Sequence, residues 1–237
     1  METYQALIAT LALTMGVGWA SGINLYAAVF VLGLAGATGN VALPEGLQVV
    51  QDPLVIAAAG IMYVVEFFVD KTPGADTGWD SLHTFIRIPA GAMLAAGAVG
   101  DVTPALEVAA GLLGGTMATA SHLTKASGRL VINTSPEPFS NWAASISEDI
   151  LVLAGLWTML NHPLLFLILM VVFLALVIWL LPKLWRVAKR IVRKVGSWLG
   201  LVEQAPADSH APDPPPATQA VSSPEAPDLR LGDDSRQ

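Results

Sequence analysis

The chain has 237 residues, of which 54% are hydrophobic and only 13% are charged. A soluble domain usually carries about a quarter charged residues, so this composition excludes an ordinary soluble fold and indicates an integral membrane protein. The formal net charge is -7, but much of the acidity lies after Leu201, so it indicates neither a cationic partner nor nucleic-acid binding. Cysteine is absent, which excludes disulfides, thiolate metal sites and thiol catalysis.

Apolar stretches divide the chain into six or seven expected helices, each close to the ~20 residues that cross the hydrocarbon core of a bilayer. The first stretch, about 4–39, is too long for a single crossing. Small and polar residues that weaken a helix interrupt it, and we predict a helix break at Ser21, Gly22 and Asn24. The stretch is therefore either two helices joined by a tight turn or one crossing followed by a re-entrant half-helix.

Two later helices carry clear start signals. Asp52–Pro53 and Thr103–Pro104 each combine an N-cap residue with a proline in the first turn. They predict helices that end near Asp70 and Ser121. Further spans are expected over about 81–100, 141–160 and 163–181. Residues 1–181 are thus predicted to form an all-α, polytopic membrane bundle of six to seven spans with a broken or re-entrant first element.

Lysine and arginine fall in alternate gaps between the apolar stretches. A run of them directly follows the last span: Lys183, Arg186, Lys189, Arg190, Arg193 and Lys194. Membrane proteins keep such residues on the cytoplasmic side. Counting backward, the gap with Lys125 and Arg129 and the gap with Lys71 are cytoplasmic too, whereas the opposite gaps hold neither residue type. We therefore expect a multi-pass protein of the plasma or inner membrane with a cytoplasmic C-terminus.

The chain ends in two segments of different character. Residues 182–201 alternate cations with apolar residues at three- and four-residue steps, which predicts a basic amphipathic helix on the membrane surface. This helix is either a stop-transfer anchor or a site for anionic lipid headgroups. Residues 202–237 are acidic and rich in proline, and we expect them to be disordered because they offer too little apolar surface to fold. The bilayer is the expected partner, and the sequence leaves homo-oligomerisation open.

Ionisable residues within or beside the apolar stretches define the candidate site, because bilayer hydrocarbon penalises buried charge. Glu66 and Asp70 are four residues apart and share one helix face. Asp80, His83 and Arg87 follow at three- and four-residue steps where the third span begins. We expect these and further residues to line a cytoplasm-facing polar cavity that serves as a substrate or ion pathway: Glu66, Asp70, Asp80, His83, Arg87, Glu137, Glu148 and Asp149.

Two further expectations concern the fifth span. Pro136 and Pro138 precede it and are expected to form a second helix break. Arg87 and Glu148 lie roughly 8 and 10 Å along their helices from the same surface, at ~1.5 Å per residue. An unpaired charge at that depth would be costly, so we expect Arg87 to pair with Glu148 or Asp149.

Other ionisable residues are expected to have less specific roles. Asp76, Lys125 and Arg129 are expected to lie in loops, where charge costs little. A divalent metal is an alternative occupant of one group of ligands, since carboxylates and imidazole suit such ions. That group comprises Glu66, Asp70, Asp80 and His83. Glycine-rich runs at 91–100 and 111–115 indicate close helix packing.

Broken helices that present backbone groups and charges to a cavity are typical of transporters. We predict a transporter or permease for a small solute, an ion or a lipid headgroup. The alternative is a structural or assembly subunit whose charges fix helix packing, and a lipid-modifying enzyme is third. The motifs of intramembrane proteases, phosphatases and headgroup transferases are incomplete or missing, so no catalytic residue and no cofactor is assigned.

Two segments carry a family resemblance. They are 69–92, which begins Val-Asp-Lys-Thr-Pro-Gly-Ala-Asp, and 133–141, Asn-Thr-Ser-Pro-Glu-Pro-Phe-Ser-Asn. Over about 6–160 the chain resembles a family of small multi-span membrane proteins known only as domain of unknown function 4126. The resemblance implies a membrane protein and the importance of these two segments, and it implies no activity. The sixth span, the basic helix and the tail are expected to lie outside it.

Overall fold

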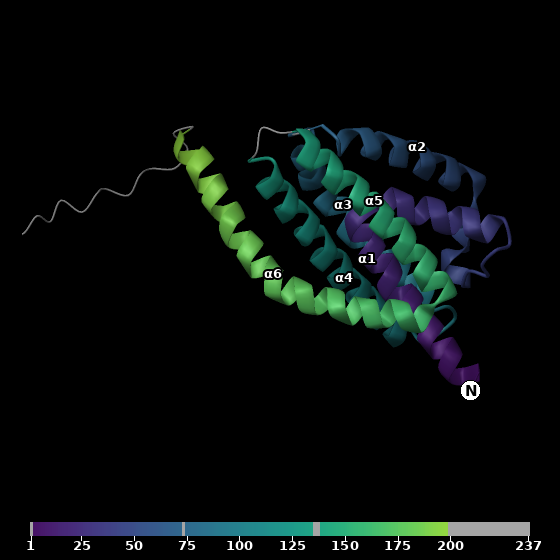
Figure 1. Ribbon diagram of the computed structural model, residues 1–237. Coiled ribbons are helices and arrows are strands. Elements are labelled where there is room, and N and C mark those ends of the chain that lie inside the picture. Colours follow the sequence, from purple (N-terminus) through teal and green to yellow (C-terminus); the bar gives the residue numbers. More distant parts are fainter. Residues whose placement is uncertain (1, 73, 135–137, 199–237) are drawn as a thin grey trace, which may run out of the picture.

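The computed structural model describes residues 2–72, 74–134 and 138–198. This part of the chain is helical, with no strand, as the sequence predicts (Figure 1). Its elements are α1 (Glu2–Ala37), the 3-10 helix η1 (Glu45–Gln51), α2 (Pro53–Val69), α3 (Ala75–Ala98), α4 (Pro104–Ile132), α5 (Pro138–Asn161) and α6 (Pro163–Trp198). The starts of α2 and α4 are as predicted, and the Asp52 carboxylate caps α2 by accepting from the Leu54 amide at 2.8 Å. The predicted end of α4 near Ser121 is wrong, because the helix continues to Ile132.

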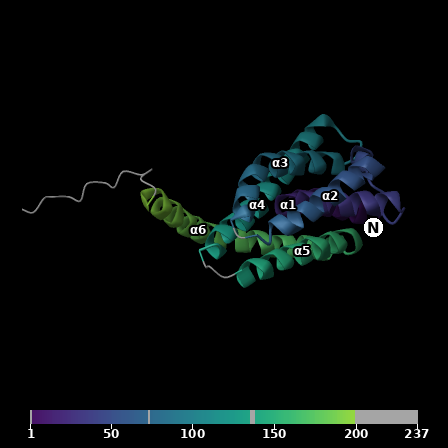
Figure 2. The ribbon, with the colours of Figure 1, turned by 90° about the horizontal axis from the view of Figure 1, so that it is seen from above.

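The first helix is the centre of the bundle and is broken where the sequence predicts. α1 contacts each of α2 to α6, and Figure 2 shows it between α3 and α5. Asn24 has non-helical backbone angles, φ -148° and ψ 93°. Its side-chain oxygen accepts a hydrogen bond from the Ala27 amide at 2.9 Å, so it caps the second half of α1. The two halves run in different directions in Figure 1.

Small residues let three helices approach closely. A Cβ atom placed on Gly18 of α1 would lie 2.6 Å from the carbonyl oxygen of Gly114 in α4. A Cβ atom on Gly91 of α3 would lie 2.7 Å from the Ala118 side chain of α4. Larger side chains would force the backbones apart, as at the helix contacts of other membrane proteins. The predicted packing role of the glycine-rich runs is therefore confirmed at these positions.

Within the described residues, three helices are long and apolar enough to cross a membrane: Glu2–Ala37, Phe139–Asn161 and Pro163–Val187. A fourth span results if η1 and α2, which are bent by 67°, are counted as one broken crossing. α3 and α4 are not among these candidates, and both carry several ionisable residues. The helical, membrane-compatible fold is thus confirmed, whereas six to seven spans and the division at residue 181 stay predictions.

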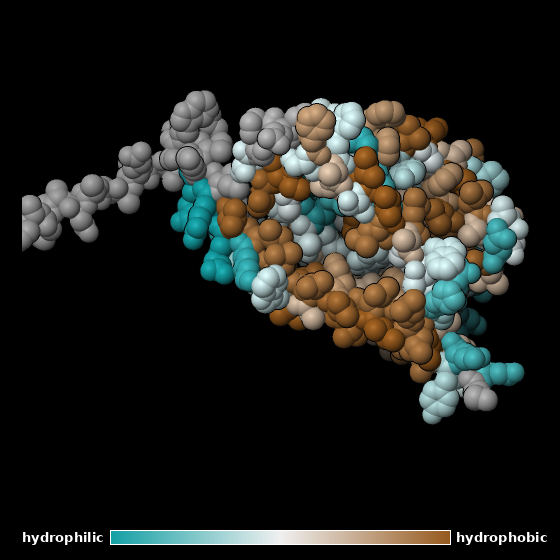
Figure 3. All heavy atoms as spheres, in the orientation of Figure 1, coloured by the Kyte–Doolittle hydropathy of each residue, from teal (hydrophilic) through white to brown (hydrophobic). Residues whose placement is uncertain are grey.

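The last helix joins an apolar stretch to the basic segment. α6 continues through Pro182, and in Figure 1 it bends partway along its length. Figure 3 shows its apolar stretch as part of a broad hydrophobic face that ends in hydrophilic side chains at the far end of the helix. The C-terminal ends of α2 and α4 and the N-terminal end of α5 meet at one end of the bundle. The predicted tail, 202–237, lies outside the described residues.

Candidate functional site

Ionisable side chains from four helices and from the turn after α2 converge at that end of the bundle, and we call them the charge cluster. Ion pairs join eight of them into one network, and Lys71 and Asp149 form a separate pair beside it. The members of the charge cluster come from α2, the turn after it, α3, α4 and α5, and each has an opposite charge within 4.0 Å. The acids are Glu66, Asp70, Asp76, Asp80, Glu148 and Asp149, and the bases are Lys71, Arg87, Lys125 and Arg129.

Arg87 joins α3 to α2. Its guanidinium donates to Glu66 and, at 2.8 Å, to Asp80. Asp80 and Arg87 are two helical turns apart, so they share one face of α3, as predicted. The predicted pairing of Arg87 with Glu148 or Asp149 is wrong. Equal depth in the bilayer was a necessary condition for that pair, but the rotation of each helix about its axis decides which groups face each other.

Lys125 lies at the centre of the cluster. Its ammonium is 2.7 Å from Asp70, 3.4 Å from Glu66, 3.6 Å from Glu148 and 3.7 Å from Asp80. Only 2% of its side chain is exposed. The predicted loop position is therefore wrong for Lys125, because α4 extends about three turns beyond Ser121 and this face points inward. The same holds for Arg129 on α4 and for Asp76 on the first turn of α3, both of which are buried.

The break in α1 supplies a further ligand to Lys125. In a regular helix the carbonyl oxygen of Ile23 would accept from the Ala27 amide. That amide donates instead to the Asn24 side chain, and the Lys125 ammonium donates to the Ile23 oxygen at 3.1 Å. The predicted break is thus part of the site. Ser21 also contacts α3, since its hydroxyl donates to the carbonyl oxygen of Arg87 at 2.9 Å.

Arg129 connects α4 to α5 and to the end of α2. Its guanidinium donates to the Glu148 carboxylate at 2.6 Å and to the carbonyl oxygen of Asp70 at 3.0 Å. It also donates to the side chain of Asn141, a buried residue that sequence reasoning missed. The four-residue step from Lys125 to Arg129, with His122 three residues earlier, is the sequence signal that these side chains share one face of a longer α4.

Two histidines border the cluster. His83, predicted as a site residue, stacks on Trp79 and lies 3.0 Å from the Tyr26 hydroxyl through Nε2. His122 was not among the predicted site residues. Its Nε2 lies 2.7 Å from the Thr84 hydroxyl, and its Nδ1 lies 3.3 Å from Arg87.

Asp149 and Lys71 form the rim of the cluster. Their charged atoms lie 3.8 Å apart, and Asp149 also accepts from the Asn24 side chain at 3.4 Å. The Lys71 ammonium lies 3.0 Å from the centroid of the Phe67 ring. Burial lowers the pKa of Lys71, while the neighbouring Asp149 and Asp70 carboxylates counteract that shift. Asp149 thus contacts both the helix break and the turn after α2.

The cluster holds more acid than base. With all groups ionised, six carboxylates face four cations, which leaves two negative charges uncompensated. One oxygen each of Glu66, Asp70 and Asp80 is buried without a hydrogen-bond donor in the described part of the chain. Uncompensated charge in a low-dielectric site is costly, so protonation of acids in the cluster would lower that cost.

Several of the residues expected to line a polar cavity are buried in ion pairs instead. Glu66, Asp80 and Arg87 are almost completely buried and pair with one another rather than lining a hollow. A pocket of about 160 Å³ does reach the cluster at Lys125 and Glu148. Glu148 is the most accessible acid of the cluster, with 21% of its side chain exposed.

Some of the residues predicted for the site are not part of the charge cluster. Glu137 and Pro136 lie outside the described residues, and Pro138 is the first residue of α5. Among residues 2–72, 74–134 and 138–198, no group of three or more histidine, aspartate or glutamate side chains has a geometry that could hold a metal ion. The geometry therefore offers no support for the metal alternative.

Comparison with known proteins identifies the family. The family model described as "Domain of unknown function (DUF4126)" matches residues 11–183, and the chain therefore belongs to this family. The match includes α6 as far as Lys183, so the expectation that the sixth span lies outside the family region is wrong. No curated protein and no solved structure matches the chain.

Proposed function

We propose that this member of the DUF4126 family is a transporter or permease that moves protons or small cations through the charge cluster. The observation that carries the proposal is the excess of acids over bases: five carboxylates and three bases share one network of ion pairs, and the Lys71–Asp149 pair lies beside it. Buried ionisable groups are costly in a bilayer and are characteristic of ion pathways and proton relays. Access would be from Glu148, Asp149 and Lys71, whose side chains keep some exposure.

The broken helix supports the same proposal. Asn24 and Ile23 connect the break in α1 to Asp149 and Lys125, so a change in the charge of the cluster would act directly on the central helix. Broken helices that contact an ion site are a recurring element of transporters. α5 makes few contacts with α4, and the Arg129–Glu148 pair bridges the two helices. Loss of this pair is our proposed opening step.

We expect Glu148→Gln to reduce cation or proton flux at least tenfold, because the amide can neither bind a proton nor attract a cation. The purified protein would be reconstituted in vesicles with an entrapped pH-sensitive dye and an imposed membrane potential. A parallel measurement would follow radioactive sodium. The matched control is Glu107→Gln, which removes an exposed acid in the first turn of α4, far along the helix from the cluster. Wild-type flux no higher than that of protein-free vesicles would contradict the proposal.

A structural or assembly subunit is the second candidate, and one observation favours it. Arg87, Lys125 and Arg129 each already contact two or more carboxylates, so the cluster could serve only to lock α2, α3, α4 and α5 together. In that case Glu148→Gln would lower the melting temperature of the purified protein, and there would be no flux to lose.

We also propose that the basic end of α6 lies on an anionic cytoplasmic leaflet, with the C-terminus in the cytoplasm. Its described cations are exposed: Lys183, Arg186, Lys189, Arg190 and Arg193. The side chain of Lys194 lies outside the described part of the chain. Lys183 lies over the Trp179 ring at 3.2 Å, and Trp185 is exposed beside it. Tryptophan and cations together are typical of the membrane interface.

This arrangement predicts lipid-dependent protection of residues 182–198. Each cation near an anionic surface contributes about 1 kcal/mol of attraction. Amide hydrogen exchange of the segment should therefore be slower in nanodiscs with anionic lipid than in purely zwitterionic ones, and high salt should remove the difference. The amides of α4, which lie inside the bundle, serve as the internal control. Equal exchange in both kinds of nanodisc would contradict the placement.

A further inference from the structure

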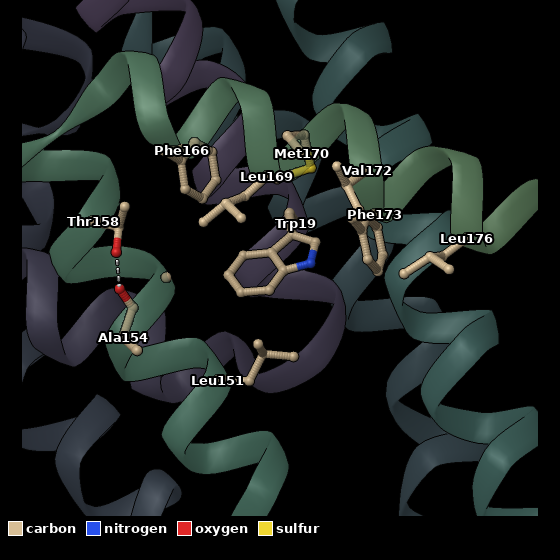
Figure 4. Close-up of a pocket in the computed structure, with 11 residues that line it drawn as sticks. Trp19, Leu151, Ala154, Thr158, Phe166, Leu169, Met170, Val172, Phe173 and Leu176 are labelled. Carbon is tan, nitrogen blue, oxygen red and sulfur yellow. Dashed lines mark hydrogen bonds between the residues drawn. The ribbon is translucent and has the colours of Figure 1, made fainter.

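Two adjoining hollows beside α6 form one groove that runs from the core of the bundle to the charge cluster. The larger, about 360 Å³, lies between α5 and α6 and has Trp19 of α1 as its wall (Figure 4). The smaller, about 160 Å³, lies beside Lys125 and Glu148. Leu151 and Phe173 line both hollows, so the two adjoin at these side chains. We call them together the lateral groove.

One face of α5 lines the whole length of the groove. Glu148, Leu151, Gly155 and Thr158 recur at steps of three, four and three residues, which places them on the same side of the helix. Ten residues of helix span about 15 Å. The groove therefore has the length of an alkyl chain, with a carboxylate at one end.

The larger hollow is apolar. Figure 4 shows Phe166, Met170 and Phe173 of α6 on one side of the Trp19 ring and Leu151 of α5 on the other. The Trp19 indole N–H is buried and has no acceptor in the described part of the chain. Apart from this donor and the Thr158 hydroxyl, which donates to the Ala154 carbonyl oxygen, the lining offers hydrocarbon and a thioether. Such a surface favours an alkyl chain over a polar solute.

The polar end of the groove favours a cationic head. Glu148, which also contacts Arg129, is its accessible carboxyl group, whereas Lys125 is nearly buried and surrounded by four carboxylates. The cluster as a whole has two more acids than bases. The smaller hollow is lined by one carboxylate, Glu148, and one cation, Lys125, whose charge is already shared among four carboxylates. A phosphate placed here would therefore find no free cation, and the excess negative charge of the cluster would disfavour a phospholipid headgroup. An ammonium group would meet the excess negative charge.

We infer that the lateral groove binds a single-chain amphiphile that ends in a protonated amine, with its alkyl chain between α5 and α6 and its ammonium at Glu148. The groove opens between helices with exposed apolar side chains, so such a molecule can enter from the hydrocarbon of the bilayer. This inference goes beyond the proposed function, because binding in the groove requires no ion flux.

The test measures binding of radiolabelled dodecylammonium to the full-length protein in phosphatidylcholine nanodiscs. We expect saturable binding above that of empty nanodiscs, competed by unlabelled dodecylammonium. Dodecanol, dodecyl phosphate and lysophosphatidylethanolamine should not compete at equal concentration. Competition by dodecanol or dodecyl phosphate would overturn the charge argument. Competition by lysophosphatidylethanolamine would show that the groove takes bilayer phospholipid instead of a free amine.

Two variants test the polar end and the apolar part of the lateral groove separately. Glu148→Gln should weaken binding at least tenfold, because it removes the accessible carboxylate. Ala154→Phe should abolish binding by filling the apolar hollow while leaving every charge in place. Ile150→Phe is its matched control, since Ile150 is an exposed α5 residue that lines neither hollow. Wild-type binding in Ala154→Phe, or an equal loss in Ile150→Phe, would overturn the inference.

The outcome is independent of the flux measurement. Absence of flux with intact dodecylammonium binding would remove the proposed transport of small cations and leave the groove assignment standing. Flux without saturable dodecylammonium binding would remove the groove assignment and leave the proposed transport of small cations standing.

Discussion

Replacing Arg87 with alanine is expected to destabilise the protein by about 3–5 kcal/mol, the usual cost of removing one partner from a buried ion pair. The guanidinium is fully buried and donates to Glu66 and to Asp80. Without it, two carboxylates on α2 and α3 would face each other in a site that water does not reach. The measurement is the free energy of unfolding, or the melting temperature, of the purified protein in detergent.

The control for this prediction is Arg186→Ala, which removes an exposed arginine of α6 and should change stability by less than about 0.5 kcal/mol. A triple variant, Arg87→Met with Glu66→Gln and Asp80→Asn, should recover part of the lost stability, because it removes the unpaired charges together with the pair. If Arg87→Ala melts like the wild type, the ion pairs do not hold α2 and α3 together.

Lys125→Met is expected to have an effect of similar size with a distinctive pH dependence. Methionine keeps much of the side-chain volume, but it leaves Asp70, Glu66, Glu148 and Asp80 around an uncharged centre. We expect a loss of about 3–5 kcal/mol at neutral pH. Acidification should restore part of it, because protonation neutralises the carboxylates that then repel one another.

The pH profile separates this explanation from a simple packing defect. Melting temperatures of the wild type and of Lys125→Met would be measured between pH 8 and pH 5. We expect the difference in melting temperature between the two proteins to become smaller as the pH falls. A packing control is Met117→Ala on the same helix, which creates a cavity at a buried apolar residue and should show a constant difference. A constant difference in Lys125→Met would mean that charge repulsion is not the cause.

Much of the local structure follows from short stretches of sequence. The break at Asn24 and the helix start after Asp52 were predictable because they depend on residues that cap or weaken a helix. The shared face of Asp80 and Arg87 was predictable from the period of the helix. The length of α4 is not predictable in this way, because its last turns contain polar residues and a glycine, which are also typical of a loop.

Which residues form ion pairs in the charge cluster could not be predicted from short stretches of sequence. Depth along a helix follows from counting residues, and equal depth predicts an ion pair between Arg87 and Glu148. The rotation of each helix about its axis is set by contacts between distant residues, such as Gly18 against Gly114. In the packed bundle Arg87 faces Glu66 and Arg129 faces Glu148.

By itself, the sequence determined that this is an α-helical protein suited to a membrane, and where its first helix breaks. Both depend on residue type and near neighbours along the chain. Only the tertiary structure decided that Lys125 and Arg129 are buried, that the Ile23 carbonyl oxygen binds Lys125, and that an apolar groove ends at Glu148. Those features depend on how close-packed helices are rotated against one another, and no local pattern encodes that rotation.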